Sequence, residues 1–354
     1  MTTPTQDIPT LVTTLLTQAI QNRASDIHIE PTARDCEIRQ RIDGVLTTVS
    51  TVPAETGRAI VGRLMVMAQL LTYRLDVPQE GRLQFSYGPT AHDLRLAIMP
   101  TTHGLRAAVR MPAELLQPGA LEELDLPKNV LDGLYAFAKS DSGMLIITGP
   151  AGSGKTTTVY ALLRHIIQTQ SGLSVISLED PVERDVPGVT QIEVKPFGEL
   201  TYERALRSIL RQDPQVLMLG EIRDAATAAL AIQAALSGHR LICTFHAADP
   251  AGAISRLLEM HIEPYQITSA LFGVVAQRLL RRKSAATYKG RIPVAEFLRL
   301  DDPLRATILN HPDAPTIRTA YQSHPTYTPM PQVARDLVEK GLTDALEVTR
   351  VLGA

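Results

Sequence analysis

The chain has 354 residues, and its 35 Lys and Arg nearly balance its 37 Asp and Glu, which leaves a formal charge of −2. That balance argues against a sequence-independent nucleic-acid coat, so we expect no direct nucleic-acid binding. No apolar run reaches the roughly 18 residues of a membrane span, and the N-terminus lacks the pattern of a secretory signal. Two cysteines, Cys36 and Cys243, make neither a disulfide framework nor a zinc cluster, so no structural zinc is expected. We therefore predict a cytosolic protein of about two domains.

Residues 1–111 predict an N-terminal α+β domain. Apolar residues at helical spacing over 8–22 and 55–71 predict two helices. Alternating apolar and polar residues predict half-buried strands of an antiparallel sheet, at Asp26–Glu30, Cys36–Asp43, Val45–Val49, Gly81–Tyr87 and His92–Ile98. Residues 112–127, rich in proline and glycine, predict a linker.

Strand and helix alternate over residues 128–283, which is typical of βαβ units and of an α/β fold with a mostly parallel sheet. The expected strands are Met144–Thr148, Ser174–Leu178, Gln215–Leu219 and Arg240–Thr244, and the expected helices are Lys155–Gln170, Tyr202–Gln212 and Ala225–Leu236. Residues 284–354 predict a helical C-terminal region. Within it, five prolines between His311 and Arg335 predict an extended connection before a last helix near Val333–Lys340.

Residues 149–156 match the phosphate-loop pattern G-x-x-x-x-G-K-[ST] between a predicted strand and a predicted helix. Glycines let backbone N–H groups turn towards phosphates, and the start of the helix adds positive potential. Lys155 would reach the β- and γ-phosphates, and the Thr156 hydroxyl would bind Mg²⁺. No Asn-Lys-x-Asp element for guanine occurs, so we predict ATP with Mg²⁺. The expected ATP-binding residues are Gly149, Pro150, Ala151, Gly152, Ser153, Gly154, Lys155, Thr156 and Thr157.

Two blocks place carboxylates at the ends of predicted strands, where parallel sheets bind their ligands. Val175–Glu183 carries the adjacent carboxylates Glu179 and Asp180. Val216–Asp224 brings Glu221 beside the phosphates, placed to polarise the attacking water. We expect Glu179 and Glu221 to be catalytic, and Asp180 is a candidate Mg²⁺ ligand.

A third block, Gly238–Ala247, ends a further strand with Thr244 and His246. His246 is predicted to sense the nucleotide state, with a packed core histidine as the alternative. Gly220 stands where many strands of this kind carry Asp. We therefore expect metal positioning to fall to Thr156, with help from Glu179 or Asp180.

Clusters of basic residues leave alternatives open. Arg207 and Arg211 are four residues apart on one predicted helix face, and we expect one or both to face the nucleotide. Pairing with surface carboxylates is the alternative. The run 281–283, Arg-Arg-Lys, predicts a solvated helix end, with a contact to acidic lipid or a membrane partner as the alternative. Cys243, in mid-strand, is predicted to be a buried, inert thiol.

The four blocks, in this order and spacing, resemble the Walker A, Asp, Walker B and His boxes of the ATPases of type II secretion and type IV pilus assembly. The resemblance extends to Ala24–Pro31, Arg41–Val45, Pro78–Arg82, Asp93–Arg95, Met99–Thr101 and Ala276–Leu279, and it covers residues 8–300. It implies a RecA-like domain that hydrolyses ATP through Lys155, Thr156, Glu179 and Glu221.

The same resemblance implies that arginines of the N-terminal domain reach the nucleotide. The candidates are Arg82, Arg95 and Arg110, because a guanidinium neutralises charge on the transferred phosphate. Arginines merely solvated on a polar sheet face are the alternative. The resemblance further implies a homo-hexameric ring beneath an inner-membrane platform protein, peripheral at the inner face of the cell membrane.

Within the family, Ser25–Pro31 and Pro78–Arg82 favour pilus assembly over retraction. We expect no extra N-terminal domain of the kind most assembly ATPases carry, so the chain looks like the competence ATPases of Gram-positive bacteria (the ComGA type). That implies a motor for a pseudopilus that takes up DNA. A retraction or general secretion ATPase, a nucleic-acid translocase and a non-catalytic ATP-binding regulator are the alternatives. Many assembly ATPases carry a four-cysteine zinc loop, whereas Arg281–Gly290 has no cysteine.

Overall fold

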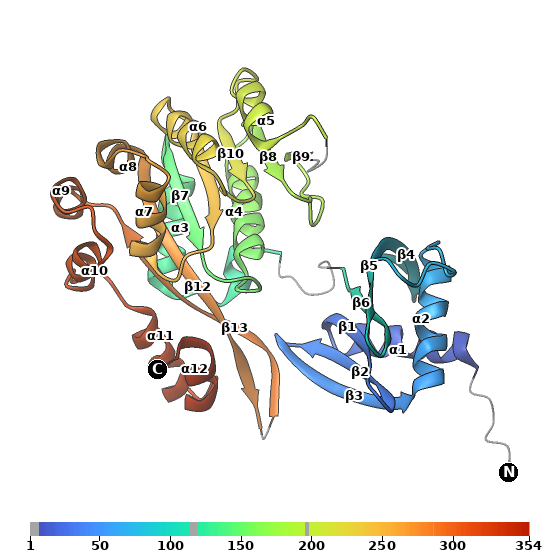
Figure 1. Ribbon diagram of the computed structural model, residues 1–354. Helices are drawn as coiled ribbons and strands as arrows, with labels where there is room; N and C mark the ends of the chain where they lie inside the picture. Colours follow the sequence, from blue (N-terminus) through green and yellow to red (C-terminus); the bar gives the residue numbers. More distant parts are fainter. Residues whose placement is uncertain (1–6, 113–118, 195–197, 286, 354) are drawn as a thin grey trace, which may run out of the picture. The chain divides into compact units, whose positions relative to one another are not determined.

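The computed structural model describes residues 7–112, 119–194, 198–285 and 287–353 (Figure 1). The chain divides into two compact units, residues 1–117 and 118–354, and each is described by itself. No helix among the described residues is long and apolar enough to cross a membrane.

The first unit is a six-stranded sheet in the order β3-β2-β1-β6-β5-β4. All neighbouring strands are antiparallel, as the sequence predicted, and β6 is a strand that the sequence analysis did not predict. Its strands are β1 (Ala24–Pro31), β2 (Asp35–Ile42), β3 (Val45–Pro53), β4 (Gln79–Tyr87), β5 (Thr90–Thr101) and β6 (Gly104–Arg110). The helices α1 (Ile8–Gln21) and α2 (Ala54–Met67) share one core with this sheet. Within residues 7–112, no helix covers the opposite face of the sheet.

Alternation along each strand explains why only one face is buried. In β5, His92, Leu94, Leu96 and Ile98 are buried, and the residues between them are exposed. Helix α2 approaches the sheet closely, since a Cβ on Gly57 would lie 2.3 Å from the Cβ of Cys36. The period-2 pattern thus selects the core face.

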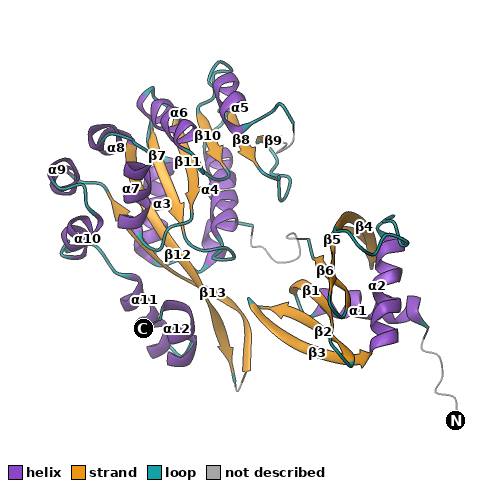
Figure 2. Ribbon diagram, in the orientation of Figure 1, coloured by secondary structure: helices purple, strands orange, loops and turns teal. Residues whose placement is uncertain are grey.

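The second unit is a seven-stranded sheet in the order β13-β12-β7-β11-β10-β8-β9. All neighbours are parallel except β12 and β13, so the predicted mostly parallel sheet is confirmed. The strands are β7 (Gly143–Thr148), β8 (Val175–Glu179), β9 (Thr190–Glu193), β10 (Val216–Leu219), β11 (Arg240–Phe245), β12 (Leu271–Ser284) and β13 (Thr287–Arg299). Figure 2 shows β12 and β13 running on as a hairpin beyond the other strands.

Helices cover both faces of this sheet, so its central strands are buried on each side. The helical elements are η2 (Leu121–Leu124), α3 (Lys128–Ala138), α4 (Lys155–Thr169), α5 (Tyr202–Ile209), α6 (Ala225–Leu236), α7 (Pro250–Glu259), α8 (Pro264–Ala270), α9 (Asp302–Asn310), α10 (Ala314–Gln322), α11 (Met330–Glu339) and α12 (Ala345–Leu352). Along β7, Leu145 and Ile147 join the core of α3 and α4, whereas Met144 and Ile146 join that of α5 to α8. Burial on both faces explains the continuous apolar runs of the sequence. Cys243 is fully buried there, as predicted, and burial raises the pKa of its thiol.

Two predicted boundaries are corrected. Residues 119–127 of the predicted linker belong to the second unit, because Leu121 and Leu124 of η2 are buried in the core that α4 shares. Residues 113–118 of that linker lie outside the described residues. The predicted start of the helical region at 284 is wrong, because it cuts the β12–β13 hairpin, whose strands pair from Gly273 with Arg299 to Ser284 with Thr287.

The predicted extended connection over 311–335 is also wrong. Pro315 lies in the first turn of α10, and Pro331 lies in the first turn of α11. At those positions the ring fixes a helical φ and the missing N–H removes no hydrogen bond, so each proline favours a helix start. A further helix, α12, follows the predicted last one.

A buried carboxylate fastens α12 to β12. Glu347 is fully buried, and its oxygens accept hydrogen bonds from the N, Nε and Nη2 of Arg281 at 2.9, 2.9 and 2.7 Å. Arg350 donates to both oxygens as well, and the Arg281 guanidinium lies 4.0 Å from the ring centre of Tyr288. The run 281–283 therefore lies on a strand and not at the predicted helix end.

The clamp formed by Glu347 with Arg281 and Arg350 predicts that the free energy of unfolding depends on pH. Burial alone would raise the pKa of Glu347, but hydrogen bonds from Arg350 and Arg281 outweigh it and lower the pKa to about 2. The contribution of this group is therefore complete above its ordinary pKa of 4.5 and is lost as the pH falls from 4.5 towards 2. In urea unfolding we expect Glu347→Gln to cost about 3 kcal/mol at pH 7 and much less at pH 3. An equal cost at both pH values would contradict the ionised clamp.

Candidate active site

The phosphate loop leaves the end of β7 and enters α4. Gly149, Gly152 and Gly154 have φ of 151°, 74° and 91°, a region that side chains disfavour. A Cβ on Gly149 would lie 2.4 Å from the backbone oxygen of Gln277 and 2.6 Å from the Ser153 Oγ. The backbone therefore forms the tight cradle that bound phosphates require, and the predicted strand–loop–helix arrangement is present.

Lys155 is the first residue of α4 and folds back over the loop. Its Nζ donates to the carbonyl oxygens of Gly149 and Pro150 at 2.7 and 3.1 Å. Burial lowers the pKa of Lys155, and the carboxylate of Glu221 opposes that shift. Glu221 and Lys155 thus lie within electrostatic reach of each other.

The sheet order brings the predicted blocks to one edge. Strand β11 lies between β7 and β10, and β8 lies beyond β10, so their carboxyl ends follow one another. Glu221 accepts from Arg223 Nε at 2.7 Å, and its other oxygen lies 3.1 Å from His246 Nε2. Arg223 also reaches Asp180, with its Nη1 3.2 Å from Oδ2. The structure therefore brings together Glu221, His246 and Asp180, with Arg223 between the two carboxylates.

Glu179 has a different environment from Glu221. It is 3% exposed and accepts hydrogen bonds from Tyr160 Oη, from Ser177 Oγ at 2.6 Å and from Gln191 Nε2 at 3.0 Å. Burial and the bond to Glu179 raise the pKa of Tyr160. With its oxygens occupied, Glu179 orders the end of β8, and its catalytic role stays a prediction. Asp180 is more open, with 20% of its side chain exposed, and its predicted role as a Mg²⁺ ligand stays a prediction.

The position before Glu221 is sterically restricted. A Cβ on Gly220 would lie 3.0 Å from the Tyr202 Oη and 3.3 Å from the Leu178 oxygen. The Thr244 hydroxyl donates to the Gly220 oxygen and so joins the ends of β10 and β11. A side chain at 220 would require the Tyr202 hydroxyl to move by a few tenths of an ångström, whereas glycine fits without a shift.

The helix arginines are engaged elsewhere. Arg207 pairs with Glu203 on its own helix at 2.9 Å, and Arg211 Nη1 donates to the Arg207 oxygen at 2.8 Å. The contact of Arg207 is that of the alternative, pairing with a surface carboxylate, whereas Arg211, just after α5, bonds to a backbone oxygen. A contact of either arginine with nucleotide stays a prediction.

A row of charged residues crosses the helix-free face of the first unit. Asp26 on β1 lies opposite Arg41 on β2 and opposite Arg110 on β6. Arg110 in turn lies opposite Arg95 on β5, and Arg95 lies opposite Arg82 on β4. Asp26 pairs with Arg41 and Arg110, but within residues 7–112 neither Arg95 nor Arg82 forms an ion pair. Like charges directly opposite destabilise a sheet, so this row favours an anion as its partner.

Sequence reasoning assigned no role to three residues of the site: Arg223, Tyr160 and Gln277. Arg223 and Gln277 fall inside the blocks Gly-Glu-Ile-Arg-Asp and Ala-Gln-Arg-Leu, and that was the only signal for them. Tyr160 carried no signal, because its contact with Glu179 depends on how α4 packs on the sheet.

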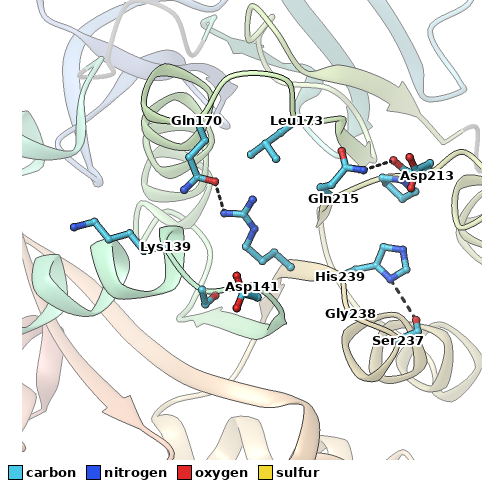
Figure 3. Close-up of a pocket in the computed structure, with 12 residues that line it drawn as sticks. Lys139, Asp141, Gln170, Leu173, Asp213, Gln215, Ser237, Gly238 and His239 are labelled. Carbon is cyan, nitrogen blue, oxygen red and sulfur yellow. Dashed lines mark hydrogen bonds between the residues drawn. The ribbon is translucent and has the colours of Figure 1, made fainter.

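A pocket of about 590 Å³ lies at the opposite edge of the same sheet (Figure 3). The residues that line it come from the segments before β7, β8, β10 and β11, and Asp141, Leu173, Gln215 and His239 are labelled in the figure. Arg240 there donates to the Ala138 oxygen at 2.6 Å and to Gln170 Oε1 at 2.9 Å. A cation at these helix C-termini is stabilising, so this pocket has a structural explanation separate from the phosphate loop.

The phosphate loop after β7 and the carboxylate after β10, in a mostly parallel sheet, define a P-loop nucleoside triphosphatase. The family model described as "Type II/IV secretion system protein" matches residues 2–350. The chain belongs to this family and is a secretion or pilus-assembly ATPase, as the sequence resemblance predicted.

Known relatives agree with this assignment. The type II secretion system protein HxcR of Pseudomonas aeruginosa is 37% identical over 318 residues, which cover 84% of this chain and 67% of HxcR. The type IV pilus assembly ATPase PilB of Thermus thermophilus is 41% identical over 268 residues, covering 76% of this chain but only 30% of PilB. The X-ray structure of the Legionella pneumophila ATPase DotB has a TM-score of 0.79 and covers 99% of this chain and 97% of that chain, at 21% identity. The last likeness shows the fold alone.

Proposed function

We propose that the chain is a motor ATPase that powers assembly of a pilus-like fibre, with Glu221 as the residue that activates the attacking water. The observation that carries this proposal is the position of Glu221 between Arg223 and His246, at the strand end beyond the phosphate loop. Contacts with these two side chains orient the carboxylate, as a water-positioning base requires. Lys155 and the backbone N–H groups of the loop would hold the β- and γ-phosphates of ATP.

Mg²⁺ would be held by the Thr156 hydroxyl with Asp180, and it would neutralise charge between the β- and γ-phosphates. The fit rests on oxygen donors, which Mg²⁺ prefers. Asp180 pairs with Arg223, which also donates to Glu221, so one guanidinium links the expected Mg²⁺ ligand to the expected base.

The arginine row supports a composite site. Arg82, Arg95 and Arg110 stand side by side on three neighbouring strands, and only Arg110 has a carboxylate partner within residues 7–112. Triphosphate chemistry gains most from a guanidinium that meets charge developing in the transition state. We therefore assign to the row the task of completing the site, from a neighbouring subunit of a homo-hexameric ring.

Turnover against protein concentration tests this arrangement. If arginines of one subunit complete the site of the next, ATP turnover per subunit should rise steeply with concentration, because dilution separates the partners. A Lys155→Ala chain at the same concentrations is the control for contaminating activity. Flat and appreciable turnover would show that one chain suffices and would remove the chemical reason for a ring.

The finer assignment is a pseudopilus that takes up DNA, beneath an inner-membrane platform protein. It rests on the resemblance of the sequence to competence ATPases, while the blocks Ser25–Pro31 and Pro78–Arg82 favour assembly over retraction. A general type II secretion motor is the second candidate, because the relative HxcR is named for type II secretion. Deleting the gene and measuring transformation frequency and protein secretion in the same strain separates the two. Loss of secretion with normal transformation would overturn the DNA-uptake assignment.

A further inference from the structure

A buried glutamine of β12 lies directly beneath the phosphate loop. Gln277 is 2% exposed and belongs to the strand next to β7, where Ala276 pairs with Thr148. Its Nε2 donates to the Ser153 oxygen at 3.0 Å, and its Oε1 accepts from the Thr158 hydroxyl at 2.9 Å. One side chain therefore ties the loop to the second turn of the helix that follows it.

The loop is shaped around this side chain. A Cβ on Gly154 would lie 2.7 Å from Gln277 Nε2, and a Cβ on Gly149 would lie 2.4 Å from the Gln277 oxygen. Two of the loop's glycines are thus required by contact with the same residue. The orientation of the amide is fixed too, because the Ser153 carbonyl can only accept and so must face Nε2.

The peptide bond gives this contact a consequence for phosphate binding. In a planar trans peptide the C=O and the following N–H point in opposite directions. Holding the Ser153 oxygen down on Gln277 therefore turns the Gly154 N–H away from β12, towards the side where the loop would receive phosphate. A loop without this hydrogen bond is free to rotate the peptide and lose one donor.

We infer that Gln277 is a positioning residue that holds the Ser153–Gly154 peptide in its phosphate-binding orientation. It acts through the loop and does not itself touch nucleotide. The inference rests on the proposed nucleotide site, which it deepens. Gln277 and Arg281 both lie on β12, and Arg281 bonds to Glu347 of α12. Strand β12 therefore connects the phosphate loop with the hairpin and with α12.

The test compares variants of the full chain by equilibrium binding of a fluorescent ADP analogue with Mg²⁺, and by ATP turnover kinetics. Gln277→Glu keeps the shape and the acceptor but loses the donor to Ser153, and Gln277→Ala removes both. We expect each to raise the Kd and the KM about tenfold, with a smaller change in kcat. Thr158→Val should raise the Kd less, and adding it to Gln277→Ala should cost nothing more, because the two share one bond.

Gln170→Ala is the matched control. Gln170 also makes two hydrogen bonds, to the Ala138 oxygen and to Arg240, at the far end of α4. Its loss should lower the thermal midpoint without changing the Kd. Equal Kd values for the wild type and Gln277→Glu overturn the inference, as does an equal weakening by Gln170→Ala, which would make general stability the cause. No binding by the wild type, matching Lys155→Ala, would overturn the nucleotide site itself.

Discussion

Replacing Glu221 with Gln should lower kcat for ATP hydrolysis by a factor of about 10² to 10⁴, the range of a positioned general base. Glutamine keeps the length of the side chain and still accepts the hydrogen bond from Arg223, but it takes no proton from the attacking water. Affinity for ADP should stay within about threefold of the wild type, because the effect belongs to the transition state. Phosphate release and equilibrium nucleotide binding, measured on one preparation, check both parts.

Glu203→Gln is the control for this change. Glu203 pairs with Arg207 on the surface of α5, and an exposed pair of this kind contributes little. We expect near-normal turnover from it. If Glu221→Gln keeps wild-type turnover, another carboxylate must be the general base, and Glu179 is the next candidate. A loss of folding in Glu179→Gln is expected on its own account, since three donors depend on that carboxylate.

The regular part of the fold was predictable because its sequence signals are local. Central strands such as β7 and β11 are buried on both faces, which produces apolar runs bounded by glycine or polar residues. The β12–β13 hairpin gave no such signal, because arginines and Lys283 interrupt the apolar run in the second half of β12. Their charges are accommodated by tertiary partners, Glu347 above all, which no local pattern reveals.

One topological rule was enough to predict which residues gather at the candidate site. The sequence did not predict which contacts their side chains make. Knowing that parallel strands end at one edge was enough to collect Glu221, His246 and Asp180. The difference between Glu179 and Glu221 could not be predicted from the sequence. It comes from Tyr160 on α4 and Gln191 on β9, whose contacts with Glu179 depend on how these elements pack against β8. Gln277 likewise belongs to the site only through the pairing of β12 with β7.

Replacing Arg95 with Gln should lower kcat by a factor of about 10³ or more, the contribution of an arginine that meets the transferred phosphate. The same change should leave the thermal midpoint unchanged or raise it. Arg95 lies between Arg82 and Arg110 on one face, so its loss relieves two like-charge contacts. A substitution that stabilises the fold and abolishes turnover identifies a residue kept for function.

Arg39→Gln, on the same face of the sheet, should have the opposite effects on stability and turnover. Arg39 pairs with Glu30 at 2.6 Å, so its loss should lower stability by up to about 1 kcal/mol and leave turnover intact. The two variants together distinguish arginines that stabilise the sheet from arginines that are proposed to bind an anion. If Arg95→Gln keeps wild-type turnover at every protein concentration, the row is a solvated surface and the composite site loses its chemical basis. If turnover falls and is restored by mixing with Lys155→Ala chains, the arginine acts across a subunit boundary, because each chain then supplies what the other lacks.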